Sequence, residues 1–308
     1  MRIVFMGTPA AAVPTLQRIL DDKHEVVAVW TQPDKPAGRG NRLAAPPVKE
    51  FALANNLPVH QPVKIKAPET LELLQSHQAD AAIVVAYGRI LPESLLNASR
   101  FGCINNHFSL LPKYRGAAPV NWAIVQGERE TGITTMKMDA GLDTGDILLQ
   151  REIIIGPDET APELLSRMAI VGAELLSETL RGLEKNDPRP QNHALASYAP
   201  VMKREDGLIT WELNASDICN RIRGFQPFPN AFAYLGEKKL VLWKASAEEL
   251  TAPLIAGTIL QAKGDDLLVA CGEGTILRLR EVQLEGKRRM NIRDFLNGIK
   301  LQVGETFV

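Results

Sequence analysis

The 308-residue sequence predicts two architectures in succession: a Rossmann-like, doubly wound, mostly parallel α/β sheet and then a small OB-like β-barrel. Two observations predict the sheet. Residues 2–6, 10–20 and 25–31 have the spacing of a strand–helix–strand unit. Residues 80–87 contain an apolar run without alternation, as expected of a central strand covered on both faces. The barrel is predicted from the short strands, separated by glycine-containing turns, that follow residue 207.

Prolines mark a boundary between two predicted domains. Pro188, Pro190 and Pro200 lie among polar residues and are typical of a stiff linker. We therefore predict an α/β domain at 1–186, a linker at 187–206 and a barrel domain at 207–308. Further elements of the first domain are predicted as strands at 102–108, 132–138 and 147–155, and helices at 68–76, 118–127 and 160–185. In the second domain we predict strands at 208–211, 231–235, 239–244, 257–262, 266–271 and 275–279, and helices near 216–223 and 292–296.

Composition and charge exclude several classes of protein. Hydrophobic residues make up 45% of the chain, enough for a packed core. Lys and Arg total 35 against 36 Asp and Glu, so any nucleic-acid binding must come from a local patch. No signal peptide and no apolar run of ~18 residues is present, and the three cysteines lack the pairing of disulfide or zinc motifs. We therefore expect a cytoplasmic protein without membrane contact, and a monomer.

Residues 102–112 hold the densest cluster of chemically useful side chains. If 102–108 is a strand, Cys103, Asn105 and His107 share one face, near the end where doubly wound sheets bind ligands. His107 could exchange a proton near neutral pH, and Asn105 could donate a hydrogen bond to a developing oxyanion. A purely structural histidine is the alternative. Cys103 is expected to pack, because no neighbouring residue would activate its thiol.

Residues 138–146 form a loop with three acids and two glycines between two predicted strands. Such loops are usually turns, and that interpretation stays open here. The functional alternative is that Asp139, Asp143 or Asp146 approaches His107 and orients it by charge pairing. A divalent-metal loop is disfavoured, because the acids lack the EF-hand pattern and no second ligand cluster accompanies them.

Several conventional motifs are absent. Gly7-Thr-Pro-Ala follows the first strand in place of Gly-x-Gly-x-x-Gly, which disfavours dinucleotide binding. There is no Gly-x-x-x-x-Gly-Lys-Ser/Thr phosphate loop, and Ser109 does not lie in a Gly-x-Ser-x-Gly elbow. The first domain is therefore predicted to be neither an ordinary dehydrogenase nor an α/β hydrolase.

Residues 33–49 form a long, proline-rich, basic connection inside the predicted α/β domain. The connection contains one acid, Asp34, against four basic residues: Lys35, Arg39, Arg42 and Lys49. Connections of this length in a compact domain tend to be functional, and the excess positive charge predicts a loop that orders on a polyanion. An ordinary solvated surface loop is the alternative.

Together these segments resemble the methionyl-tRNA formyltransferase family, a branch of the 10-formyltetrahydrofolate-dependent formyltransferases. The Asn-x-His and Ser-Leu-Leu-Pro motifs mark the wider group, whereas the basic loop and the second domain select the tRNA branch. The resemblance rests on Gly7-Thr-Pro, the basic loop 31–40, the segments 86–92, 105–119 and 141–146, and the later segments 198–211 and 222–229. One departure is Asn106, at a position that is more often apolar in the family.

The resemblance implies a reaction and a set of site residues. It implies transfer of the formyl group of 10-formyltetrahydrofolate to the α-amino group of methionyl-initiator tRNA for translation initiation, without a metal. The family's catalytic residues fall on Asn105, His107 and Asp143. Its folate-binding positions fall on Ser109, Leu110, Leu111, Pro112, Ala86, Tyr87, Gly88, Ile90 and Leu91. Its tRNA-binding loop falls on Lys35, Arg39, Arg42 and Lys49, and the C-terminal barrel would bind the tRNA elsewhere.

Two other functions compete with this one. A formyltransferase that acts on a sugar amine or another small amine would need neither the basic loop nor a second domain. An RNA-binding protein without catalysis is opposed by the presence of Asn105, His107 and Asp143 together.

Overall fold

The computed structural model describes residues 1–37, 42–185, 187–249 and 255–307, which form two compact units. The first unit comprises Met1–Pro119, Glu130–Ile154 and Leu165–Ala199. The second comprises Val120–Arg129, Ile155–Leu164 and Pro200–Val308. The segments 120–129 and 155–164 thus group with the second unit, although they precede the predicted linker. The boundaries 1–186 and 207–308 stay a prediction.

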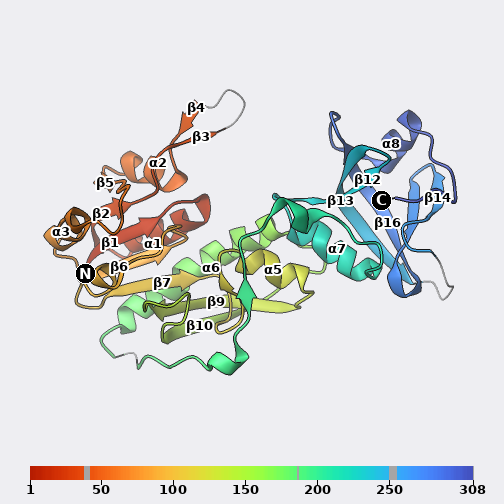
Figure 1. Cartoon of the computed structure of the whole chain (residues 1–308). Coiled ribbons are helices and arrows are strands. Elements are labelled where there is room, and N and C mark those ends of the chain that lie inside the picture. Colours follow the sequence, from red (N-terminus) through yellow and green to blue (C-terminus); the bar gives the residue numbers. More distant parts are fainter. Residues whose placement is uncertain (38–41, 186, 250–254, 308) are drawn as a thin grey trace. The chain divides into compact units, whose positions relative to one another are not determined.

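The first unit is built on a sheet of seven strands within the described residues, in the order β10-β9-β7-β6-β1-β2-β5 (Figure 1). The pairs β1–β2, β1–β6, β2–β5 and β6–β7 are parallel, whereas β7–β9 and β9–β10 are antiparallel. The strands are β1 (Arg2–Gly7), β2 (Glu25–Trp30), β5 (Val59–His60), β6 (Ala81–Val85), β7 (Cys103–His107), β9 (Glu130–Lys137) and β10 (Ile147–Ile154). The predicted doubly wound, mostly parallel sheet is confirmed.

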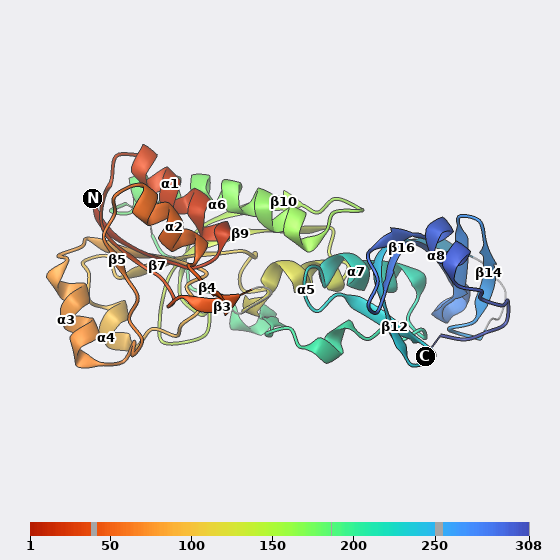
Figure 2. The same ribbon diagram turned by 90° about the horizontal axis from the view of Figure 1, so that it is seen from above.

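Helices cover both faces of this sheet (Figure 2). One face packs against α3 (Pro68–Ser76) and α4 (Glu93–Leu96), through a core that includes Trp30, Leu74 and Leu95. The other face is covered by α1 (Val13–Asp21) and α6 (Ala161–Gly182), joined where Arg18 donates to Ser177 Oγ. Because both faces are covered, β6 is buried at every position, which explains its unbroken apolar run.

The basic connection 33–49 contains secondary structure that the sequence did not predict. Lys35–Ala37 (β3) and Arg42–Ala44 (β4) pair as an antiparallel hairpin, which projects beyond α2 (Pro47–Ala54) in Figure 1. Helix α2 begins where the paired prolines end, with proline at its first position and Val48 and Ala52 buried. The φ angle of proline is that of a helix, and the N–H group that proline lacks would have no acceptor within the first turn. Pro47 therefore favours the start of the helix at this position.

A two-stranded pairing attaches the supposed linker to the first unit. Arg115–Gly116 (β8) pairs in parallel with Tyr198–Ala199 (β11), and Ala117 N donates to Ala199 O at 2.9 Å. Ahead of it lies a short 3₁₀ helix, His193–Leu195 (η2). Most of residues 187–199 therefore lie on the α/β unit and do not simply span between two domains.

The second unit contains an antiparallel sheet of the barrel-like class that was predicted. Its described strands follow the order β12-β13-β16-β15-β14, with β17 paired to β16. They are β12 (Ala231–Leu235), β13 (Lys238–Glu249), β14 (Ile259–Lys263), β15 (Asp266–Ala270), β16 (Thr275–Leu284) and β17 (Met290–Asn291). The remaining elements are α5 (Pro119–Val125), α7 (Ala215–Gly224), α8 (Ile292–Gly298), η3 (Arg204–Gly207) and η4 (Gly272–Gly274). The 3₁₀ turn η1 (Ala10–Ala12) precedes α1 in the first unit.

The predicted strand at 208–211 is wrong. Leu208 makes one isolated bridge to Phe232, and Leu213 N then donates to Thr210 O in a turn. Ile209 and Trp211 are buried in the core of the second unit, so their alternation reflects packing under the sheet and not a paired strand. Apolar alternation over four residues does not distinguish these two cases.

Candidate active site

Strand β7 places two of the predicted catalytic side chains on one face of the sheet. Cys103 Sγ donates to Leu95 O of α4 at 3.6 Å, whereas Asn106 Nδ2 lies 3.4 Å from Thr15 Oγ1 of α1, on the opposite face. The predicted alternation is therefore confirmed, and Asn105 and His107 share the face of Cys103. Burial raises the pKa of the Cys103 thiol to about 12, which makes it a packing residue.

His107 is oriented by a main-chain carbonyl. Its ring is buried, and Nε2 lies 3.0 Å from Tyr114 O. A carbonyl oxygen only accepts hydrogen bonds, so Nε2 carries a proton and Nδ1 is the ring nitrogen left for chemistry. The half-buried Asn105 carboxamide has no hydrogen-bond partner among the described residues, so its donors are also available.

Asp143 is the acid of its loop that reaches His107. Its Oδ2 lies 3.8 Å from His107 Nδ1, which is an ion-pair distance and too long for a hydrogen bond. The same oxygen accepts a hydrogen bond from Gly116 N at 2.8 Å. Asp139 instead accepts from Gly141 N and Thr144 Oγ1 and so organises the turn. The turn interpretation is therefore right for Asp139, while Asp143 faces the imidazole.

Two supporting groups escape sequence reasoning, because they belong to the main chain. The carbonyl of Tyr114 orients His107 and the amide of Gly116 holds Asp143. Tyr114 N donates to Ser197 Oγ, and Arg115 N donates to Ser197 O. Residues 187–199 therefore hold the main chain of residues 114–116, which positions the His107 and Asp143 side chains. Main-chain groups have no residue signature, so only the pairing of β8 with β11 could have revealed them.

The first predicted folate-binding segment directly follows β7. Ser109 is buried and its hydroxyl donates to Lys113 O at 2.7 Å, which closes a turn. Leu111 packs with Met136 and Ile147. Leu110 and Pro112 are half-buried, so they are the members of this segment with side chains open to a ligand.

The second predicted folate-binding segment follows β6, the parallel neighbour of β7, so both segments leave the same edge of the sheet. Ala86 and Gly88 have φ of +46° and +78° and are exposed. The Tyr87 and Leu91 side chains are buried in the core, and burial raises the pKa of Tyr87 to about 12. Ile90 is 77% exposed. The main chain of this segment and Ile90 are thus the parts accessible to a ligand.

The four basic residues of the loop 33–49 have different surroundings. Lys35 is exposed at the start of the hairpin. Arg39 lies outside the described residues, and of Arg42 only the main chain, at the start of β4, is described. Lys49 Nζ contacts both carboxylate oxygens of Asp34 at 2.7 and 2.8 Å, and this ion pair holds the pKa of Asp34 below its usual range. Lys49 therefore braces the base of the hairpin.

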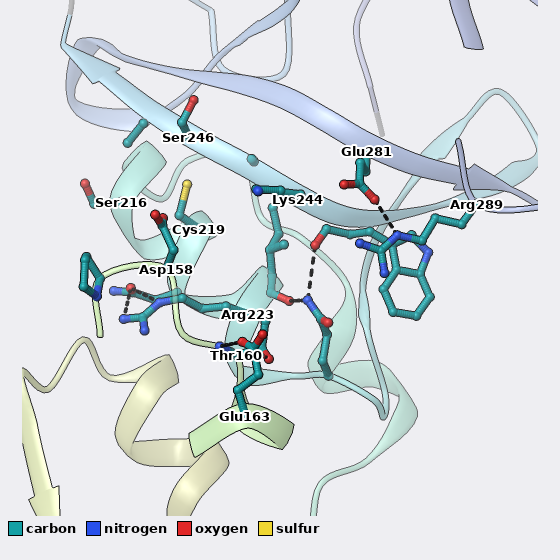
Figure 3. A pocket seen from close by; sticks show the side chains of 17 residues that line it. Asp158, Thr160, Glu163, Ser216, Cys219, Arg223, Lys244, Ser246, Glu281 and Arg289 are labelled. Atoms are coloured by element: carbon teal, nitrogen blue, oxygen red, sulfur yellow. Dashed lines mark hydrogen bonds and ion pairs between the residues drawn. The ribbon is translucent and has the colours of Figure 1, made fainter. Parts of the chain in front are cut away.

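A pocket of about 420 Å³ lies in the second unit and contains none of the predicted catalytic residues (Figure 3). Its charged groups are mostly paired within the protein. Arg289 donates to Glu281, Arg223 donates to the carbonyls of Gly156 and Glu159, and the Glu163 carboxylate accepts from Thr160 at the start of α6. The last contact confirms the predicted helix start. This pocket offers no group comparable to the pair of His107 and Asp143.

Within the described ranges, no three His, Cys, Asp or Glu side chains come together as a metal-binding group. Among the helices that the structure describes, none combines the length and apolar character that a membrane crossing requires.

The fold and the site define a class of enzyme. A carboxamide and an imidazole at the end of a central strand, with a carboxylate opposite, suit the transfer of a carbonyl-containing group with movement of a proton. Family models narrow this class: "Formyl transferase" matches residues 1–180, and "Formyl transferase, C-terminal domain" matches residues 201–300. The chain belongs to the formyl transferase family.

Curated relatives match almost the whole chain. A protein of Geobacter metallireducens named methionyl-tRNA formyltransferase is 50% identical over 307 residues, covering 99% of this chain and 97% of the relative. One of Acetivibrio thermocellus with the same name is 48% identical, covering 99% of each.

Solved structures share the fold at lower identity. A sugar 3N-formyl transferase, WlaRD, crystallised with dTDP and 5-N-formyl-THF, has a TM-score of 0.66 at 19% identity, covering 94% of this chain and 99% of its own. HypX of Aquifex aeolicus, in complex with tetrahydrofolic acid, has a TM-score of 0.62 at 18% identity, covering all of this chain and 50% of its own.

Proposed function

We propose that this chain transfers the formyl group of 10-formyltetrahydrofolate to the α-amino group of methionyl-initiator tRNA, giving N-formylmethionyl-tRNA for translation initiation. The observation that carries the proposal is identity of about 50% over nearly the whole length with proteins named methionyl-tRNA formyltransferase. The approach of Asp143 to His107 supplies the chemical groups that this transfer needs.

In the proposed reaction the methionyl amine attacks the formyl carbon, a new C–N bond forms and the bond from that carbon to N10 of the folate breaks. The amine loses one proton and N10 gains one, so no oxidant or metal is required. Asn105 and the protonated Nδ1 of His107 donate hydrogen bonds to the formyl oxygen as negative charge develops there. Asp143 stabilises the protonated imidazole and assists the transfer of the proton.

The folate would bind along the sheet edge where β6 and β7 end. Leu110 and Pro112 would line one side, with the buried Ser109 and Leu111 supporting them, and the main chain of residues 86–91 would line the other. Two observations support this: both segments leave neighbouring parallel strands at the same edge, and Ile90 presents an exposed apolar side chain to cover an aromatic ring.

The hairpin of β3 and β4 would contact the acceptor end of the tRNA through Lys35, Arg39 and Arg42, while Lys49 holds its base against Asp34. The second unit would bind the tRNA elsewhere. We also propose that the protein is a monomer and that it is cytoplasmic. Its three free cysteines support the second of these, because they suit a reducing compartment.

The test of the proposed function is transfer of labelled formyl from 10-formyltetrahydrofolate to charged initiator tRNA, beside charged elongator tRNA and a free dTDP-amino sugar. Selective labelling of the initiator is expected. Labelling of the amino sugar alone would instead assign the chain to the sugar-amine formyltransferases. Binding of tRNA without any labelling would make it an RNA-binding protein.

Arg42→Ala is expected to raise KM for the charged tRNA by about 10-fold, because one phosphate contact to a cation is lost, and to leave KM for the folate unchanged. The measurement is initial-rate kinetics at fixed salt. Arg100→Ala removes the same charge from an exposed pair with Glu184 and should leave both constants unchanged. An unaltered KM for tRNA in Arg42→Ala would remove the hairpin from the binding surface.

A further inference from the structure

Gln191 lies in the predicted linker, within the part at 187–199 that belongs to the first unit, and its side chain points into the interior of that unit. Its side chain is buried, and its Nε2 donates two hydrogen bonds, to Asp143 O at 2.9 Å and to Gly145 O at 2.7 Å. It therefore holds the main chain of the loop that presents the Asp143 carboxylate. No motif in the sequence marked this residue.

Arg115 fixes the orientation of the Gln191 amide. Its Nε and Nη2 lie 3.1 and 2.6 Å from Gln191 Oε1, and Nη2 also contacts His193 Nδ1 at 3.1 Å. A guanidinium only donates, and the carbonyls of Asp143 and Gly145 only accept. One orientation of the amide satisfies both sides, with oxygen toward Arg115 and nitrogen toward the loop. Because Arg115 is only 3% exposed, this arrangement is shielded from water.

Asp143 needs this support, because its own backbone is strained. Its φ is +52°, a left-handed conformation that costs an aspartate energy and persists where surrounding contacts enforce it. Gln191 holds the carbonyl of the strained residue itself, and Gly116 holds its carboxylate. The two contacts together define where Oδ2 lies relative to His107 Nδ1.

We propose that Gln191 is a positioning residue for formyl transfer, acting through Asp143: it fixes the loop so that the carboxylate stays beside the imidazole. The inference rests on the proposed function and deepens it. Because Gln191 is buried and both ends of its amide are bonded within the protein, its loss should lower kcat and spare both KM values.

The segment around Gln191 is anchored independently on each side. Arg189 and Ile147 exchange two main-chain hydrogen bonds, at 2.8 and 2.9 Å, and Tyr198–Ala199 pairs with β8. Substitution of Gln191 therefore leaves the path of the chain in place. This makes single-residue variants of the full-length protein a fair test.

Two variants separate positioning from packing. Gln191→Ala removes the side chain, whereas Gln191→Glu keeps its size and strengthens the pairing with Arg115 but directs a carboxylate oxygen at two carbonyls. Both are expected to lower kcat by about 10- to 100-fold with KM values unchanged. If Gln191 only filled space, Gln191→Glu would be nearly normal, and that result would overturn the proposal.

Gln226 offers a matched control. It is buried in the second unit, and its Nε2 also donates to two main-chain carbonyls, those of Ile222 and Trp243. Gln226→Ala should lower the melting temperature about as much as Gln191→Ala, with kcat unchanged. An equal fall of kcat in the two variants would mean that general destabilisation explains both.

A second readout needs no turnover. The amides of Gly116 and Ala117 are adjacent, but the first donates to Asp143 Oδ2 and the second to Ala199 O. In Gln191→Ala, hydrogen exchange resolved to single residues should be about 10-fold faster at Gly116 and unchanged at Ala117.

The exchange result separates the two proposals. Suppose that the unmodified chain does not formylate tRNA, while Gln191→Ala shows faster exchange at Gly116 alone. This result would support the positioning role and reject the proposed function. Unchanged exchange at Gly116 would overturn the positioning role whatever the activity. Faster exchange at both amides would also overturn it, by showing that Gln191 supports the whole β8–β11 pairing.

Discussion

Replacing His107 with alanine is expected to lower the single-turnover rate of formyl transfer by about 10³-fold and to leave the affinity for tRNA unchanged. The reason is geometric. Nε2 is bonded to Tyr114 O, so in the proposed mechanism only Nδ1 can donate a hydrogen bond to the formyl oxygen. Asp143 Oδ2 lies 3.8 Å from Nδ1, where it would stabilise the protonated ring. Alanine removes the proton donor and leaves the Asp143 charge without its partner.

The measurement is a rapid-quench transfer assay with enzyme in excess, together with filter binding of charged tRNA. His60→Ala is the matched control, since His60 is a half-buried histidine of the same unit whose ring packs against Trp30, on β2. It should transfer formyl at the normal rate. A His107→Ala protein within about 10-fold of the normal rate would refute acid–base catalysis by this residue.

Replacing Gly116 with alanine is expected to destabilise the protein by about 3 kcal/mol and to abolish most activity. Gly116 has a φ of +118°, a region essentially limited to glycine, and an added Cβ would lie 2.7 Å from Ala199 O. The main chain would have to move, and with it the amide that holds Asp143 and the neighbouring carbonyl that orients His107.

Thermal unfolding and kcat would be measured on the same preparation. Gly264→Ala is the control, since Gly264 has a φ of +64° but nothing within 4 Å of the added Cβ. Gly264→Ala should lower the free energy of unfolding only by the backbone strain, about 1–2 kcal/mol, and its kcat should be normal. If Gly116→Ala were no less stable than Gly264→Ala, the close approach of β8 to β11 would not be essential to the fold.

The sequence predicted those features that depend on periodicity. The strands around the site follow from unbroken or alternating apolar runs, and alternation alone placed Asn105 and His107 on one face. The choice of Asp143 among three acids came from the family resemblance, because spacing within a glycine-rich turn does not determine which side chain faces inward. The assignment of the folate and tRNA residues also rests on that resemblance.

The sequence did not predict the support of the site, because that support is non-local. β8 and β11 have two residues each and lie about 80 positions apart, too short to show a period. Tyr114 and Gly116 act through main-chain atoms, and Gln191 looked like one more polar residue in a proline-rich linker. In each case the partner is set by tertiary packing and not by local pattern.

The pairing of β8 with β11 has a consequence for how this chain can be recombined. Residues 187–199 belong with the α/β unit, since Ser197 holds the main chain of residues 114–115, whose carbonyl at Tyr114 orients His107. A chimera joined at Pro188 would combine the α/β sheet of one parent with residues 188–199 of another. Exchanges between relatives should therefore be joined after Ala199, so that residues 187–199 and the residues 114–116 that they contact come from the same parent.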